Sequence, residues 1–286
     1  MSVNSSGSSL HPLIYRCMDS SIAVDLSSII SSIRVMVLLP LCVLVLCLGL
    51  QRWRRPSQSR SHGDIFTLHL VYLELIAVVG FFVLLCGLYM AKPRVTEVGV
   101  SLTNQIFPAQ MSFHFLTCLE RYLAVVHPVT YRRMKQSAGV RIRNASVACV
   151  WLLCGSWTGI SVLLSHTVPV VPLMLLLVLS LVIMSFCSLR VLRVLMRPRP
   201  GDVRAANRSK RRTIATVVAI LLVQWLWFIA LLVTMALDMS GKLGYEGGCV
   251  ALVCGMGFTM PSSLVLPLLF LHRAGKRLCC VCSDGE

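Results

Sequence analysis

Charged side chains at the edges of long apolar runs, or inside them, are the residues of this sequence that could do chemistry. Glu120 and Arg121 stand together where an apolar run gives way to a basic segment. At a membrane border such a pair either anchors the helix, with the arginine reaching to the lipid headgroups, or takes part in a functional site. Glu74 lies inside another apolar run, with no cation near it in the sequence. Because a charged carboxyl is costly at mid-membrane, we expect Glu74 to be neutral and hydrogen-bonded, with a proton-linked switch as the alternative.

The composition indicates that these side chains are positioned by helices in lipid. Apolar residues make up 56% of the 286-residue chain and charged residues 13%, whereas about a quarter of the residues of a soluble protein are charged. The 27 Lys and Arg residues outnumber the 11 Asp and Glu residues, which gives a net charge of +16. This charge lies in short segments between apolar runs, and nucleic-acid binding needs it gathered on one folded face. We therefore expect a membrane protein that contacts membrane lipids and has no nucleic-acid partner.

Seven apolar runs are long enough to cross the hydrocarbon core as helices. Their continuity excludes the short alternating strands of a membrane β-barrel. The predicted fold is all-α: a seven-transmembrane helix bundle over 29–272, after an extracellular segment at 1–28 and before a cytoplasmic tail at 273–286. A short amphipathic helix is expected along the inner leaflet where the tail begins. The approximate spans are 29–50, 65–90, 98–126, 145–165, 168–195, 214–237 and 249–271.

The distribution of basic residues predicts the orientation of these spans. Four Lys and Arg residues fall in 51–64, six in 121–143, nine in 190–212 and three in 273–277. Basic loops favour the cytoplasm, so we predict a multi-pass plasma-membrane protein with an extracellular N-terminus and a cytoplasmic C-terminus. The same rule divides the apolar stretch 145–195 into two spans, at a turn over Ser165–Pro169. The basic residues left outside are Arg16, Arg34, Lys92, Arg94 and Lys242.

Most of the 13 cysteines lie inside apolar runs, where Cys behaves as a small hydrophobe. Cys17 and Cys249 are placed for an oxidising exterior, where they either form a disulfide or remain two free thiols. The tail cysteines would lie at the inner membrane surface, where a reducing cytosol favours palmitoylation over pairing. They are Cys279, Cys280 and Cys282. An external glycosylation sequon begins at Asn4.

The end of the third predicted span resembles that of the rhodopsin-like (class A) G-protein-coupled receptors. In that family the third span ends in Asp or Glu, then Arg and Tyr, with a proline a few residues further on. Here Glu120, Arg121 and Tyr122 are followed by Pro128. Further likenesses are Trp151 in the fourth span, Trp225 in the sixth, and Leu266-Pro267-Leu268-Leu269-Phe270 in place of the seventh-span Asn-Pro-x-x-Tyr.

The resemblance implies a receptor that couples to a heterotrimeric G protein. In the family, ligand binding near the sixth-span tryptophan, here Trp225, swings the cytoplasmic end of that span outward. Glu120 would restrain Arg121 at rest, and the released Arg121 would contact the G protein. We expect no enzymatic activity, no cofactor and no metal.

Several family features are absent from this sequence. Trp227 takes the place of the proline that kinks the sixth span, and Thr96 lies in the region of a cysteine that forms the usual extracellular disulfide. No acid stands near Arg211 or Arg212 to hold Arg121, so we expect elevated basal activity.

Glu74 stands where the family has an aspartate that binds sodium. The positions of its usual partners are occupied by Gln110, Ser262 and Leu266, which suit sodium less well. We therefore do not expect sodium regulation.

Helical spacing indicates candidate ligand-binding residues. Thr103, Asn104 and Phe107 rise along the outer half of the third span. They are expected to face Trp225, Phe228 and Ile229 of the sixth span and Met256 of the seventh. Ordinary bundle packing is the alternative for each of these residues. Thr103 stands where amine receptors carry an aspartate, so we expect a small uncharged or lipid-like ligand rather than a biogenic amine.

Two functions fit the sequence. The first is a receptor that turns binding of an extracellular ligand into G-protein activation. The second is a non-coupling or constitutively active seven-span relative, a binding scaffold or decaying receptor, which the missing family features favour. The intact Glu-Arg-Tyr sequence favours coupling. A transporter or channel would need several intramembrane charges or broken helices, and the sequence indicates one buried carboxyl.

Overall fold

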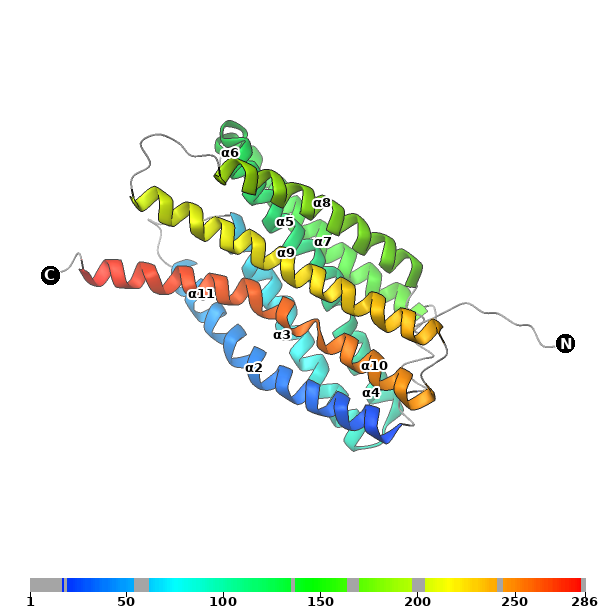
Figure 1. The fold of residues 1–286 in the computed structure, drawn as a ribbon. Coiled ribbons are helices and arrows are strands. Elements are labelled where there is room, and N and C mark those ends of the chain that lie inside the picture. The colour runs from blue at the N-terminus through cyan, green and yellow to red at the C-terminus, as the bar shows by residue number, and fades with distance from the viewer. Residues whose placement is uncertain are drawn as a thin grey trace.

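The protein is all-helical in the part of the chain that the computed structural model describes, which is residue 17 and residues 20–53, 62–134, 137–163, 170–196, 204–240 and 244–283. No strand occurs among these residues, so the expected helical class is confirmed. Long helices run alongside one another along the bundle (Figure 1). The uninterrupted long ones are α2 (Ser21–Trp53), α3 (His62–Tyr89), α7 (Ser137–Leu163), α8 (Val170–Met196) and α9 (Arg204–Met239).

Two further passages through the bundle are interrupted, although the sequence predicted each as one continuous span. The first consists of α4 (Pro93–Asn104) and α5 (Ile106–Val126), and the second of α10 (Tyr245–Gly257) and α11 (Met260–Ser283). Each break precedes a proline in the first turn of the following helix, Pro108 in α5 and Pro261 in α11. A proline has no N–H to give to the carbonyl four residues earlier, so the helical hydrogen-bond ladder is interrupted there.

Five of the helical segments are long and apolar enough to cross a membrane, judged by length and composition. They are Ser21–Gln51, Asp64–Tyr89, Leu177–Met196, Val217–Thr234 and Tyr245–Leu271. The α4–α5 passage and α7, which the sequence also predicted to span, are not among them. Helix α5 carries Gln110, His114 and Glu120 on its buried side, and polar residues lower the hydropathy of a segment even where they face the bundle interior.

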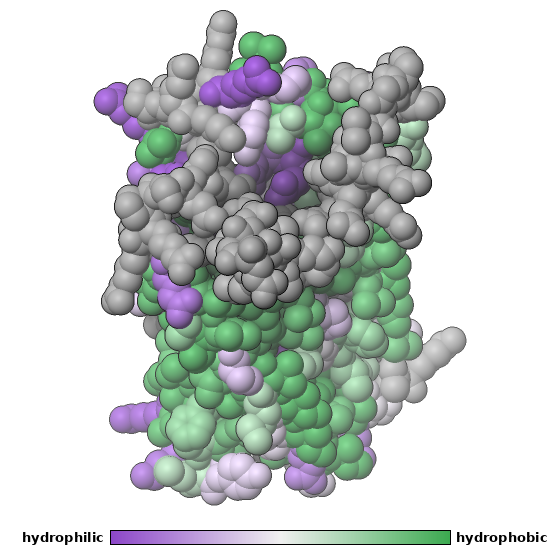
Figure 2. All heavy atoms as spheres, turned by 90° about the vertical axis from the view of Figure 1, so that its left-hand side faces the viewer, coloured by the Kyte–Doolittle hydropathy of each residue, from purple (hydrophilic) through white to green (hydrophobic). Residues whose placement is uncertain are grey.

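The outer surface of the helices is apolar. Figure 2 shows hydrophobic residues covering the middle of the visible face, with hydrophilic residues gathered toward its two ends. Large exposed apolar side chains occur on several helices, including Met36 of α2, Phe82 of α3, Leu152 of α7 and Leu222 of α9. An apolar surface of this extent is what a helix bundle in lipid requires and what a soluble monomer avoids.

Helix α3 packs against α4 through two glycines. A Cβ atom added at Gly87 would lie 2.6 Å from the Thr96 backbone nitrogen, and one at Gly99 would lie 2.5 Å from that of Leu84. Small residues allow helix backbones to approach this closely in membrane proteins. The short turn between the two helices contains Ala91 at a φ of 50°, a left-handed conformation that non-glycine residues rarely adopt.

The largest buried cluster joins α3 and α5 to their neighbours. Leu70, Leu73 and Ala77 of α3 pack with Ala109 and Phe113 of α5. Trp151 of α7 packs against this cluster and donates from Nε1 to His69 Nδ1 over 3.4 Å. Helix α5 therefore runs through the centre of the bundle, where its polar residues meet those of other helices.

The short helix α6 (Pro128–Met134) follows α5 directly and lies at the end of the bundle where α8 ends and α9 begins (Figure 1). Helix α4 and the start of α2 lie at the opposite end (Figure 1). Helix α11 continues without interruption to Ser283, so the separate amphipathic helix expected at 273 is not formed. Residues 273–283 contain no proline, and their single glycine, Gly275, does not end the helix.

Candidate functional site

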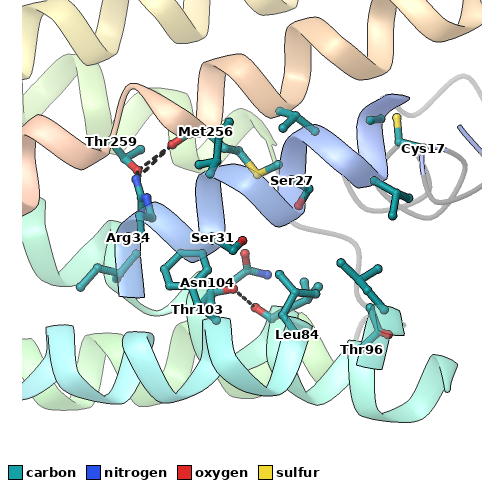
Figure 3. Close-up of a pocket in the computed structure, with 18 of the residues that line it drawn as sticks. Cys17, Ser27, Ser31, Arg34, Leu84, Thr96, Thr103, Asn104, Met256 and Thr259 are labelled. Carbon is teal, nitrogen blue, oxygen red and sulfur yellow. Dashed lines mark hydrogen bonds between the residues drawn. The ribbon is translucent and has the colours of Figure 1, made fainter. Parts of the chain in front are cut away.

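A cavity of about 120 Å³ lies between α2, α3, α4, α5 and α10. Ser27, Ile30, Ser31 and Arg34 line it from one face of α2, because residues three and four apart share a helix face. Ser31 and Asn104 point into it from different helices (Figure 3). The remaining described lining residues are Cys17, Ala23, Val24, Phe81, Leu84, Leu88, Thr96, Val100, Thr103, Ile106, Phe107, Val253, Met256 and Thr259.

The predicted ligand-binding residues divide into two groups in the structure. Thr103, Asn104, Phe107 and Met256 line the cavity. The three from the sixth predicted span do not: Trp225 is 41% exposed and Ile229 is 52% exposed, whereas Phe228 packs against the buried cluster around Trp227, which Phe107 also contacts. That part of the predicted site is wrong, because α9 presents a different face to the bundle.

Trp227, rather than Trp225, is the buried tryptophan of α9. Its side chain is 3% exposed and stacks on Phe107, with the ring centroids 5.6 Å apart. Trp225 lies toward α8 and donates from Nε1 to Ser185 Oγ over 3.3 Å. Trp227 is thus the tryptophan of α9 that contacts a residue of the cavity lining.

Arg34 is buried within the bundle, although the sequence assigned it to the outside. Helix α2 begins at Ser21, eight residues before the predicted span, so Arg34 lies well inside the helix. Its Nη2 donates to the Met256 carbonyl over 3.2 Å and to Thr259 Oγ1. Its guanidinium carbon also lies 5.1 Å from the centre of the Phe81 ring. These contacts satisfy polar groups at the break between α10 and α11, which would otherwise be costly in an apolar surrounding.

Glu74 is hydrogen-bonded, as expected, but it is not a lone charge. Gln110 Nε2 donates to Glu74 Oε1 over 2.7 Å and lies 2.6 Å from Ser263 Oγ. Arg34 is near enough for electrostatic attraction to Glu74, so a cation approaches this carboxyl in space that the sequence does not place beside it. Gln110 is therefore a direct partner of Glu74.

Glu74, Gln110 and Ser263 form a buried polar layer. A second buried contact extends this polar layer along α5. His114 Nε2 lies 3.0 Å from Ser262 Oγ, and both residues are 1% exposed. Residues 110 and 114 are one turn apart on α5, and Ser262 and Ser263 are adjacent on α11. The two pairs therefore join α5 to the first turn of α11, just after the helix break. Glu74 links α3 to the same layer.

A disulfide joins Cys17 to Cys249, with the two Cα atoms 5.2 Å apart. Of the two alternatives left open by the sequence, the structure contains the bond. Cys17 lines the cavity, and Cys249 is the fifth residue of α10. The bond therefore ties the segment before α2 to the start of α10, and Cys17 lies at one end of the cavity lining (Figure 3).

The Glu120–Arg121–Tyr122 sequence lies near the end of α5, followed by Pro128 at the first position of α6. Glu120 is 6% exposed and accepts a hydrogen bond from the Tyr131 hydroxyl of α6 over 3.1 Å. Tyr122 Oη lies 3.3 Å from His127 Nε2. Buried Nε of Arg121 has no hydrogen-bond partner among the described residues.

Pro267 and Phe270 are both buried in α11. Phe270 packs with Cys42 and Val45 of α2 and Val71 of α3. It therefore acts as a packing residue where the family has a hydroxyl-bearing tyrosine.

The structure does not describe the side chains at the predicted modification sites. Asn4 lies outside the described residues, and so do the side chains of Cys279, Cys280 and Cys282, whose backbone belongs to α11. Among the described residues, no group of three or more His, Cys, Asp or Glu side chains is placed to hold a metal ion.

Sequence reasoning missed Arg34, Ser31 and Trp227. The spacing of Ser27, Ser31 and Arg34 on one helical face was the available signal for the first two. Comparison with models of known protein families and with curated protein sequences finds no match to this chain.

Proposed function

We propose that this protein is a seven-span membrane receptor of the rhodopsin-like type, which binds a small ligand at one end and activates a heterotrimeric G protein at the other. The observation that carries the proposal is the course of helix α5. Thr103 and Asn104 of the neighbouring helix α4 and Phe107 in the first turn of α5 line the cavity. The other end of α5 carries Glu120 and Arg121. A ligand and a cytoplasmic partner would therefore contact opposite ends of one passage.

The buried polar layer supplies a physical link between the two ends. Arg34 contacts both the cavity and the α10–α11 break. Helix α11 is in turn hydrogen-bonded to α5 through Ser263–Gln110 and Ser262–His114. A ligand that displaces Arg34 or Met256 would shift the bonds that position α11 against α5. Coupling between sites requires such an element with two arrangements.

The G-protein end also has features of a restrained resting state. Tyr131 of α6 holds Glu120 by a hydrogen bond, and the guanidinium of Arg121 has capacity for a partner at Nε. Nine basic residues lie in 190–212, the part of the sequence in which α8 ends and α9 begins, and their charge would attract anionic lipid and acidic protein surfaces. The positive-inside rule favours a cytoplasmic side for these residues, and a plasma-membrane location goes with the proposed receptor function.

The test is nucleotide exchange by a panel of G proteins in membranes that carry the wild-type chain or Arg121→Ala. We expect basal exchange above that of mock membranes, lowered to background by the substitution. Arg132→Ala is the matched control, because Arg132 is an exposed residue of α6 in the same basic region. Exchange that is equal in the wild type and in mock membranes, at confirmed surface expression and with ligand bound, would favour the non-coupling scaffold instead.

The two helix breaks beside the cavity favour a second candidate, carriage of the ligand across the membrane. Discontinuous helices flank substrate sites in many transporters, and the sequence predicted neither break. Flux of ligand into vesicles that contain the purified protein distinguishes this function from signalling. Flux above that of protein-free vesicles, without any change in nucleotide exchange, would replace the receptor assignment.

A further inference from the structure

The charge of the cavity wall is unbalanced. Among the described residues that line it, Arg34 carries a positive charge and none carries a negative one. Arg34 is 3% exposed, and Glu74, which attracts it electrostatically, makes no direct ion pair with it. Its nearest acid in the polar layer, Glu74, is not part of the cavity lining and accepts its hydrogen bond from Gln110. A buried cation without a paired anion is costly, so a ligand that brings one negative charge is favoured here.

The guanidinium has donors to spare for such a ligand. Both of its hydrogen bonds leave from Nη2, toward Met256 and Thr259. The N–H groups of Nη1 and Nε have no recorded partner in the described part of the chain, and an arginine carries five N–H donors in all. Ser31 and Asn104 point into the same space and add a hydroxyl and an amide donor (Figure 3).

The rest of the wall is mainly apolar. Its apolar lining residues include Ile30, Leu84, Leu88 and Val253. Arg34 and Thr259 lie at one end of the lining residues in Figure 3, and Cys17 and Thr96 at the other. A ligand that matches this wall has a charged head at the Arg34 end and a hydrocarbon body that extends toward the disulfide.

We propose that the cavity binds an amphipathic monocarboxylate, a molecule of the size of a medium-chain fatty acid, whose carboxylate pairs with Arg34. A carboxylate supplies the single negative charge and the planar acceptors that a guanidinium binds best. A neutral lipid would leave the cation unpaired, and a phosphate dianion would bring a second charge into an apolar space with no second cation. The sequence favoured a small uncharged or lipid-like ligand, and a fatty acid is of the lipid-like kind but carries a charge.

The inference deepens the proposed receptor function by naming the ligand class, and it is tested by binding alone. Purified full-length protein in lipid nanodiscs is titrated with tritiated octanoate or tritiated octan-1-ol, with empty nanodiscs subtracted. We expect octanoate to bind about tenfold or more tightly than octanol, as a charge-assisted pair in a buried site implies. Equal binding of the two compounds, or no saturable octanoate binding, would overturn the proposal.

Substitutions locate the site. Arg34→Gln is expected to reduce octanoate binding to the level of octanol, and retention of the preference in this variant refutes the role of Arg34. Because Arg34 also bonds the α10–α11 break, Ser31→Leu provides a second test that fills the cavity and leaves those bonds in place. Ser31→Leu is expected to abolish octanoate binding, whereas Ser156→Leu on the exposed face of α7 is expected to leave it unchanged. Octanoate binding that survives Ser31→Leu would place the ligand elsewhere.

A failure of this proposal is distinguishable from a failure of receptor function. Saturable octanoate binding without nucleotide exchange would support the site and count against coupling. Arg121-dependent basal exchange without octanoate binding would support coupling and refute the ligand class.

Discussion

Arg34 of α2 donates a hydrogen bond to the carbonyl of Met256, 222 positions further along the chain, at the last turn of α10. A second bond from the same nitrogen reaches Thr259, in the break before α11. The first and last long passages of the bundle are therefore joined at the point where the last one is interrupted.

The close approach of α3 and α4 predicts that Gly99→Ala destabilises the protein. The added Cβ would lie 2.6 Å from the Cα of Leu84 as well as against its nitrogen, so the helices must separate, at a cost of about 1–3 kcal/mol. Thermal unfolding in detergent measures the loss. Gly155→Ala is the control, because its Cβ would meet nothing within 4 Å. An equal effect of the two substitutions would show that helix propensity, not packing, is being measured.

The two tryptophans of α9 are predicted to behave differently. Trp227→Ala removes a ring that is 3% exposed and stacked on Phe107, with a loss of stability of about 3 kcal/mol. Trp225→Ala removes a ring that is 41% exposed, with a loss of less than about 1 kcal/mol. The melting temperatures of the two variants measure these two losses of stability. The reverse order would restore Trp225 as the buried residue.

Gln110→Leu is predicted to destabilise the bundle more than Glu74→Gln. The first removes the donor to Glu74 Oε1 and the contact with Ser263, and a buried group left unpaired costs about 1–3 kcal/mol. The second keeps an oxygen at the accepting position. Chemical or thermal unfolding of the two variants gives the comparison. A larger effect of Glu74→Gln would mean that the negative charge of Glu74, through its attraction to Arg34, matters more than the hydrogen bond.

Loss of the disulfide is predicted to lower stability by about 2–5 kcal/mol, since a cross-link between distant positions restricts the unfolded chain. Cys17→Ser and Cys249→Ser should each show this loss, and the double variant should show no more than either single one. Thermal unfolding with and without reductant measures it. Additive effects of the two single substitutions would indicate that the cysteines act separately rather than as a pair.

The sequence predicted the helical class and most of the helix positions because apolar runs are a strong signal. It counted Arg34 with the outer residues because the predicted span began only five residues earlier, at Ile29, whereas α2 begins at Ser21. The sequence alone does not distinguish an arginine that lies in a loop at the edge of an apolar run from one that is buried in the bundle. Its partners, Met256 and Thr259, are remote in sequence.

The rotational setting of α9 could not be predicted in the same way. Apolar residues cover every side of this helix between Ile214 and Leu237, so its hydrophobic pattern does not indicate which face is buried. The resemblance drawn from the sequence favoured Trp225, whereas packing against Phe107 and Met111 buries Trp227. The helix breaks carried a usable signal in Pro108 and Pro261, which interrupt runs that were otherwise predicted to be continuous.

The bond between Cys17 and Cys249 has a consequence for biosynthesis. Its two cysteines are 232 residues apart, so Cys17 emerges from the ribosome long before its partner is translated. The thiol must stay reduced and accessible while every intervening helix is inserted, and a truncated chain that stops before α10 keeps it free. Labelling of Cys17 in newly made chains would therefore separate unfinished or misassembled molecules from mature ones.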